Sequence, residues 1–198
     1  MLIFLVCLAF AGPVAWAADP SRQTIVLLRH GEKPPAGLGQ LDCQGLNRAL
    51  ALPPVLARLF GRPAAIFAPN PATRVRDKGG DFDYVRPLIT IEPTAIAFGM
   101  PVDASVGFTD TDGLQRRLGA PALHNALVFV AWEHWRIVEI TRSLLARHNG
   151  DAGVVPAWSE DDYDSIYIVR ISRGADGVRA SFERARQGLN GQPRNCPG

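Results

Sequence analysis

Residues 24–32 have the sequence TIVLLRHGE, in which a short apolar run is followed at once by a polar cluster. The run from Thr24 to Leu28 consists of β-branched and aliphatic residues, which is typical of a strand buried in a parallel sheet. The cluster from Arg29 to Glu32 would then lie at the C-terminal end of that strand. Ligands bind beyond the C-terminal ends of the strands in open α/β sheets, so we expect these polar residues to face a ligand.

The rest of the chain continues this alternation of strands and helices. Further strands are predicted at Ala64–Ala68 and Ala126–Trp132, with an edge hairpin formed by Ser165–Ile171 and Val178–Arg184. Helices are predicted at Leu41–Leu59, Arg86–Phe98, Thr111–Leu118 and Glu133–His148. Strands alternating with helices imply an α/β protein, a three-layer α/β/α sandwich with a mostly parallel central sheet.

Prolines and glycines affect one of these helices and predict one loop. The helix at Leu41–Leu59 is expected to begin at the N-cap Asp42, and Pro53 and Pro54 are expected to kink or split it. The segment Pro69–Tyr84 is polar and rich in glycine and proline, so it is predicted to be a loop.

The N-terminal segment resembles a secretory signal peptide. Residues 2–11 are apolar, and the small residues of Ala15-Trp16-Ala17 suit a cleavage site. The apolar run is too short to cross a bilayer as a helix. Residues 1–17 are therefore predicted to be removed, leaving residues 18–198 as a single domain that is periplasmic or secreted and has no stable membrane insertion.

Cysteine usage and charge narrow the class of protein further. Removal of residues 1–17 leaves Cys43 and Cys196, and in an oxidising compartment these two thiols would form a disulfide; two free thiols are the alternative. The formal charge of +2, with no basic run, gives no electrostatic signature of nucleic-acid binding. The expected partner is a small molecule.

The tripeptide Arg29-His30-Gly31 contains residues suited to phosphate chemistry. A histidine is a competent nucleophile when one ring nitrogen is held as a donor and the other keeps its lone pair. A neighbouring arginine recognises phosphate oxygens through two parallel hydrogen bonds. Gly31 allows the backbone to approach an anion closely, and Lys33 would add positive charge at the mouth of the pocket.

An Arg-His-Gly sequence directly after a first strand resembles the signature of the histidine phosphatase (phosphoglycerate mutase-like) superfamily. The segment Leu41-Asp42-Cys43-Gln44-Gly45 is similar to the Leu-Thr-x-x-Gly helix start of that family. The resemblance extends from Thr24 to about Ile171. It implies a phosphatase that acts on a small phosphorylated substrate without a cofactor or metal.

The family also places a second arginine at the start of a helix and a second histidine after a late strand. Arg86-Pro87-Leu88-Ile89-Thr90 matches the spacing of the arginine motif better than Arg74 or Arg76, although Arg74 is kept as a substrate-binding candidate. The second histidine corresponds to His134, which follows the strand at Ala126–Trp132. The histidines at positions 124 and 148 match nothing in the family and are expected at the surface.

The resemblance implies that His30 attacks phosphorus while Arg29, Arg86 and His134 bind the phosphoryl oxygens. The general acid is left open, with Glu133 as the first candidate; Glu133 could equally serve only to position His134. The other candidates for the acid are Asp110 and Asp112, and the remaining candidates for substrate binding are Gly31, Glu32, Lys33 and Arg74.

Two other classes of function remain open. A non-catalytic phosphate-binding or interaction module would have the same pocket without a working acid. A metallohydrolase would use His30, Glu32 and His134 as ligands of a metal ion.

Overall fold

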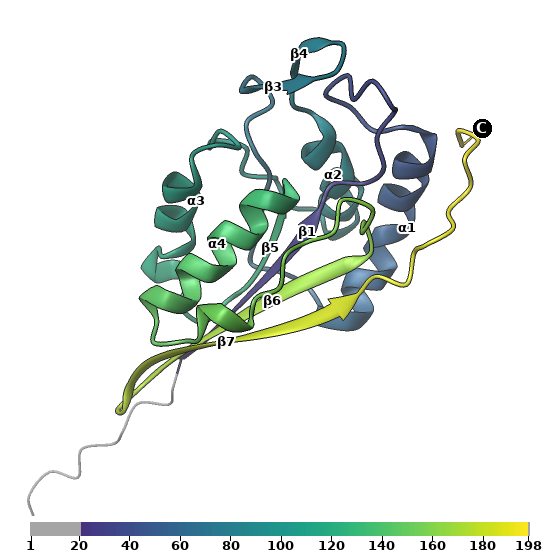
Figure 1. Cartoon of the computed structure of the whole chain (residues 1–198). Helices are drawn as coiled ribbons and strands as arrows, with labels where there is room; N and C mark the ends of the chain where they lie inside the picture. The colour runs from purple at the N-terminus through teal and green to yellow at the C-terminus, as the bar shows by residue number, and fades with distance from the viewer. Residues whose placement is uncertain (1–20, 198) are drawn as a thin grey trace, which may run out of the picture.

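The computed structural model describes residues 21–197, so the predicted signal peptide at residues 1–17 lies outside the described residues. The central sheet has five strands in the order β2-β5-β1-β6-β7 (Figure 1). Their bounds are β1 Ser21–Arg29, β2 Ala65–Phe67, β5 Leu127–Trp132, β6 Ser165–Gly174 and β7 Gly177–Arg186.

The sheet is mixed but mostly parallel. Strands β2, β5 and β1 are parallel neighbours. Strand β6 is antiparallel to both β1 and β7, so it alone runs against the other strands of this sheet. The mostly parallel sheet and the edge hairpin formed by β6 and β7 are therefore confirmed.

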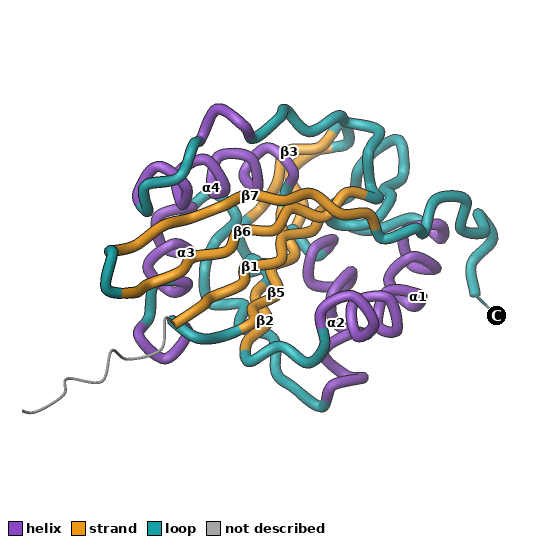
Figure 2. The backbone as a smooth tube through the Cα atoms, turned by 90° about the horizontal axis from the view of Figure 1, so that it is seen from below, coloured by secondary structure: helices purple, strands orange, loops and turns teal. Residues whose placement is uncertain are grey.

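Helices cover both faces of the sheet, as Figure 2 shows. Helices α3 and α4 pack on one face, and α1 and α2 pack on the other. Successive side chains of a strand point to opposite faces, so Ile25 and Leu27 pack with α3 and α4 while Val26 and Leu28 pack with α1 and α2. This arrangement confirms the three-layer α/β/α sandwich. The helix bounds are α1 Cys43–Phe60, α2 Arg86–Phe98, α3 Thr111–Leu118 and α4 His134–Arg147, with short 3₁₀ turns at Pro121–Leu123 and Ala152–Val154.

Helix α1 begins after the predicted N-cap, and of the two effects predicted for its prolines, a kink or a split, the split is wrong. Asp42 is the N-cap and accepts a hydrogen bond of 2.8 Å from the backbone N–H of Gly45. The helix continues through Pro53 and Pro54 to Phe60. A proline inside a helix costs about 3 kcal/mol. Burial of Leu52 and Leu56, both fully inaccessible, offsets this cost by about 1.5–3 kcal/mol for each side chain.

The segment Pro69–Tyr84 is not wholly a loop, which corrects a second prediction. It contains a two-stranded hairpin of β3 (Arg74–Asp77) and β4 (Gly80–Asp83). Val75 is paired with Phe82, and both are less exposed than the residues that alternate with them, so the hairpin has the period of two expected of strands. In Figure 1 this hairpin lies beyond one end of the central sheet.

The C-terminal segment is fastened to α1. Cys43 and Cys196 form the predicted disulfide, with their Cα atoms 4.4 Å apart. The Asn47 side chain also donates hydrogen bonds to the carbonyls of Pro193 and Asn195 at 2.9 and 2.8 Å. Figure 1 shows the tail running along this helix. Within residues 21–197, the structure has no helix that combines the length and the apolar character of a membrane span.

Candidate active site

His30 follows the last residue of β1 and is held with one ring nitrogen occupied. Its Nδ1 atom lies 2.7 Å from the carbonyl oxygen of Gly31. Since a carbonyl only accepts, Nδ1 carries the proton and Nε2 keeps a free lone pair. The ring is buried, and burial together with the charges of Arg86 and Arg29 lowers the pKa of His30 well below 6.5. His30 is therefore a neutral imidazole at pH 7, which is the nucleophilic form.

Parallel pairing brings the second histidine to the same end of the sheet as the first. Strands β1 and β5 are neighbours in a register that pairs Arg29 with Trp132. The chain continues from these two residues to His30 and to Glu133, after which His134 begins α4. The two histidines, which are distant in the sequence, thus follow adjacent strand ends.

Arg29 is buried beneath the segment that precedes β6. Its guanidinium lies 4.0 Å from the centre of the Tyr163 ring, and its Nη1 atom donates to the backbone carbonyls of Glu160 at 2.5 Å and Asp162 at 3.2 Å. Burial lowers the pKa of Arg29, although Tyr163 and Glu133 oppose the shift. The Nε atom of Arg29 is buried and has no hydrogen-bond partner among residues 21–197.

Arg86 is the first residue of α2 and is almost fully buried. Its Nη1 atom forms an ion pair of 2.6 Å with Asp77 of the β3–β4 hairpin, and its guanidinium lies 4.8 Å from the centre of the Tyr84 ring. No side chain caps this helix N-terminus. The Arg86 N–H donates to the Gly39 carbonyl at 3.0 Å and Pro87 has no N–H, so what the helix end offers an anion is mainly its partial positive charge. Like Arg29, Arg86 has a buried Nε atom that lacks a partner in the described part of the chain.

His134 and Glu133 act as a pair at the start of α4. Glu133 is the N-cap, and its carboxylate accepts a hydrogen bond of 3.0 Å from the backbone N–H of Arg136. Its other oxygen lies 2.7 Å from Nδ1 of His134, but this contact lacks the direction of a hydrogen bond. Burial alone would raise the pKa of Glu133, yet His134 and the backbone N–H groups lower it below its ordinary value. Glu133 is therefore an anion that supports His134.

These side chains line one cavity of about 400 Å³ at the C-terminal ends of β1 and β5. Its lining consists of Arg29, His30, Lys33, Val75, Arg76, Asp77, Arg86, Phe108, Glu133, His134, Trp135, Glu160, Asp161 and Tyr163. The Nε2 atom of His134 is buried without a partner among the described residues, as are the Nε atoms of the two arginines. Buried polar atoms are normally hydrogen-bonded, so these three atoms are suited to bind a polar ligand. A phosphoryl group, with several acceptor oxygens, fits them.

Gly31 has a role in backbone packing. A Cβ atom on Gly31 would come within 2.9 Å of the Gly45 carbonyl oxygen, and one on Gly45 would lie 2.3 Å from the carbonyl oxygen of Glu32. The loop after β1 therefore packs directly against the first turn of α1. The N–H of Gly31 also donates to the Thr90 hydroxyl of α2 at 2.9 Å, so both helices on this face position the residue after His30.

Three predicted substrate-binding residues, Gly31, Glu32 and Arg74, are not part of the cavity lining. Glu32 points toward α1, where its carboxylate forms an ion pair of 2.7 Å with the buried Arg48. Arg74 is exposed on the hairpin, where it contacts Asp83 and the backbone of Asp81. Lys33 does line the cavity.

The two loop candidates for the general acid are also absent from the lining. Asp110 is the N-cap of α3 and accepts from the Gly113 N–H, and Asp112 forms an ion pair with Arg147. Neither residue lines the cavity, and His124 and His148 do not line it either.

The sequence interpretation missed five residues of the site region: Asp77, Tyr84, Glu160, Asp161 and Tyr163. All belong to the segments before α2 and before β6, where no motif was recognised. Tyr84 is fully buried, its ring packs edge-on to His30 at 6.1 Å, and burial strongly raises its pKa. The sequence signal that could have identified Tyr84 was its position two residues before Arg86, the predicted phosphate-binding arginine.

The metal-binding alternative receives no geometric support. Residues 21–197 include no group of three or more His, Cys, Asp or Glu side chains arranged to hold a metal ion. Of the three proposed ligands, Glu32 is already bound to Arg48.

The fold is similar to the folds of solved phosphatases and phosphoglycerate mutases. No protein-family model and no curated protein sequence matches the chain. Among solved structures, a mycobacterial glucosyl-3-phosphoglycerate phosphatase is 14% identical, with a TM-score of 0.54 over 81% of this chain and 97% of that one. A Plasmodium falciparum phosphoglycerate mutase is 12% identical, with a TM-score of 0.52 over 85% and 92% of the two chains. Phosphoglycerate mutase from Bacillus anthracis is 10% identical, with a TM-score of 0.55 over 86% and 95%. At these identities the likeness concerns the fold.

Proposed function

We propose that this protein is an exported phosphatase that hydrolyses a phosphomonoester through a phosphohistidine on His30. One observation carries the proposal. A neutral histidine with a free Nε2 atom lines the same cavity as three buried nitrogen atoms that have no partner among the described residues, on Arg29, Arg86 and His134.

The chemistry follows from that arrangement. The phosphoryl oxygens would accept hydrogen bonds from Arg29, Arg86 and His134, while Nε2 of His30 attacks phosphorus opposite the leaving oxygen. The bond to the leaving oxygen breaks, and water then hydrolyses the phosphohistidine. Such preorganised donors stabilise the charge of the transition state, and loss of one costs roughly 10²- to 10³-fold in rate.

Two features support export. Residues 1–17 resemble a signal peptide, and Cys43 is bonded to Cys196. Disulfides persist in oxidising compartments such as the periplasm or the extracellular space. This location disfavours a glycolytic mutase, because phosphoglycerates are cytoplasmic, and it favours hydrolysis of a small phosphomonoester.

Trapping the intermediate tests the proposal. The mature protein is mixed with a ³²P-labelled phosphomonoester and quenched in alkali, because a phosphoramidate survives alkali and is released by acid. We expect acid-labile label on His30, and loss of both label and turnover in His30→Ala. His134→Ala should slow label formation without preventing it. His124→Ala is the matched control, since His124 does not line the cavity. Acid-stable label on serine or aspartate would contradict the proposal.

The same cavity in a non-catalytic phosphate-binding module is the second candidate. This candidate is favoured because two carboxylates of the cavity are already occupied and cannot act as an acid. Asp77 is paired with Arg86, and Glu133 contacts His134. Phosphate binding measured by calorimetry, without turnover of any phosphomonoester, would identify such a module. Chelator treatment tests the metallohydrolase separately, because only that enzyme would lose activity.

A further inference from the structure

Hydrolysis of an alkyl phosphate requires a proton donor for the leaving oxygen, and this inference rests on the proposed phosphatase function. Without an acid the leaving group departs as an alkoxide, and a positioned general acid contributes about 10²- to 10⁴-fold in rate. Four carboxylates line the cavity: Asp77, Glu133, Glu160 and Asp161. The four carboxylates differ in whether they already have a hydrogen-bond or ion-pair partner.

Asp77 and Glu133 are held as anions. Asp77 accepts a hydrogen bond of 2.6 Å from Arg86 and one of 2.9 Å from the Gly39 N–H. Burial opposes its ionisation, but Arg86 and Gly39 lower the pKa of Asp77 below its ordinary value. Glu133 caps α4 and contacts His134. An ionised carboxylate has no proton to give to a leaving oxygen, so neither group is suited to be the donor.

Glu160 and Asp161 have free carboxylates. Both side chains are exposed, and neither forms a hydrogen bond or ion pair through its carboxylate with any described residue. They belong to the segment between α4 and β6 that crosses over Arg29. An exposed carboxylate at the mouth of a phosphate site is placed where the leaving group, rather than the phosphoryl group, would lie.

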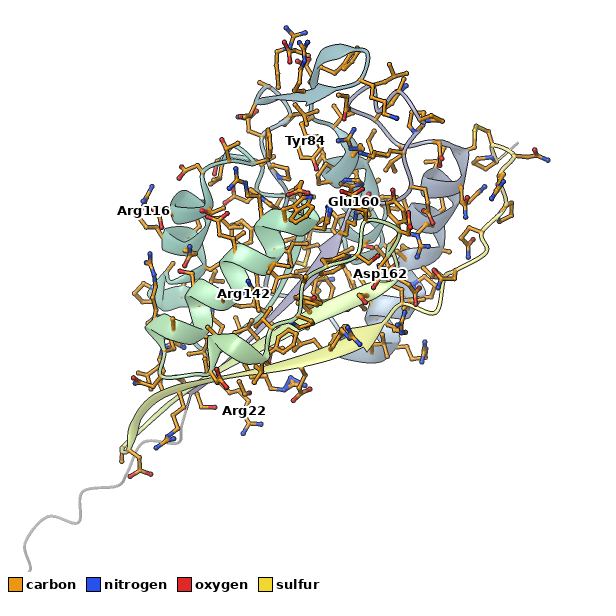
Figure 3. All side chains as sticks on the ribbon, viewed as in Figure 1. Arg22, Tyr84, Arg116, Arg142, Glu160 and Asp162 are labelled. Atoms are coloured by element: carbon orange, nitrogen blue, oxygen red, sulfur yellow. A yellow bond between two sulfur atoms is a disulfide. The ribbon has the colours of Figure 1, made fainter. Side chains whose placement is uncertain are left out.

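Backbone anchoring distinguishes Glu160 from its neighbour. The Glu160 carbonyl accepts a hydrogen bond of 2.5 Å from Nη1 of Arg29, which fixes residue 160 beside a phosphate-binding arginine. The Glu160 carboxylate also acts electrostatically on Lys33, which lines the cavity from the loop after β1. Asp161 has neither relationship. Figure 3 shows Glu160 at the same end of the molecule as Tyr84, which packs against His30.

We propose that Glu160 is the general acid of this phosphatase. As Nε2 of His30 forms its bond to phosphorus, the bond from phosphorus to the leaving oxygen breaks, and its electron pair takes the proton of the Glu160 carboxyl group. In the second step the Glu160 carboxylate removes a proton from the water that attacks the phosphohistidine, which restores both groups.

The test compares leaving groups. p-Nitrophenolate leaves without protonation, whereas glycerol requires a proton, so Glu160→Gln should lower kcat/KM for glycerol phosphate by about 10²-fold or more. Its kcat/KM for p-nitrophenyl phosphate should remain near that of the wild type, because this ratio reports only the steps up to loss of the first product. Phosphohistidine should accumulate in the variant, since hydrolysis also loses its base.

Glu92→Gln is the matched control and should leave both substrates unaffected, because Glu92 is exposed on α2 and does not line the cavity. Equal loss on both substrates in Glu160→Gln would indicate a structural role and overturn the proposal, as would a selective loss in Asp161→Asn instead. Failure of the underlying function is distinguishable, because the wild type would then neither label His30 nor release nitrophenol.

Discussion

Replacement of Arg86 by alanine should remove more activity than the loss of one phosphate donor would explain. The guanidinium is about 3% exposed and forms its ion pair with Asp77, whose side chain is about 7% exposed. Alanine therefore removes a donor from the cavity and also leaves a buried carboxylate without its cation. Breaking a buried ion pair in this way costs about 3–5 kcal/mol of stability, so the unfolding free energy must be measured alongside the rate.

The two effects on rate can be estimated separately. Loss of one donor to the phosphoryl oxygens costs about 2.7–4 kcal/mol, or roughly 10²- to 10³-fold. Repulsion between the unpaired Asp77 and one charge of the substrate, at about 5 Å and an effective dielectric constant of about 20, adds about 3 kcal/mol, a further factor of roughly 10². We therefore expect Arg86→Ala to lower kcat/KM by about 10⁴-fold.

A double-mutant comparison separates these contributions. In Arg86→Ala with Asp77→Asn the repulsion is absent, so kcat/KM should recover by roughly 10² while remaining well below that of the wild type. The control is Arg74→Ala, because Arg74 is exposed and its ion pair contributes little. Turnover of p-nitrophenyl phosphate is the assay. If Arg74→Ala were as damaging as Arg86→Ala, or if Asp77→Asn brought no recovery, the assignment of Arg86 to the phosphate would be refuted.

Two further predictions concern stability. The disulfide closes a sequence separation of 153 residues, so Cys43→Ser with Cys196→Ser should lower the unfolding free energy in urea by about 2–5 kcal/mol; an unchanged midpoint would contradict this. Burial and the charges of Arg86 and Arg29 lower the pKa of His30 in the folded protein. Just below pH 6.5 the imidazole therefore binds a proton only in the unfolded chain, so acidification favours unfolding. Between pH 6.5 and 5.5 His30→Asn should lose less stability than the wild type, by up to about 1.4 kcal/mol, and equal losses would disprove the burial argument.

The local elements were largely predictable because their signals are contained within each segment. Helices Arg86–Phe98 and Thr111–Leu118 have the predicted bounds, and both end at a glycine. Strands β1 and β5 are buried on both faces, so apolar runs marked them. The β3–β4 hairpin escaped prediction because its short strands are polar, and only the pair Val75 and Phe82 carries the alternation.

The composition of the site was only partly predictable. Arg29, His30, Arg86 and His134 were assigned from order and motif, and the structure brings all four to one cavity; their catalytic roles remain predictions. For Glu32 and Lys33, order and motif could not predict which side chain faces the cavity. They are adjacent in the sequence, yet Glu32 pairs with Arg48 and Lys33 lines the cavity, because the direction of each side chain depends on which element packs beside it.

By itself the sequence determined the strand-to-helix alternation, the nucleophile candidate at the end of β1 and the pair of cysteines. These depend on local periodicity, on motif order and on a count of residues. Only the tertiary structure decided that Asp77 pairs with Arg86, that Tyr163 stacks on Arg29 and that Glu160 is anchored at the mouth of the cavity. Those contacts join segments far apart in the chain, and their formation depends on the packing of helices and loops around the sheet, which no local pattern encodes.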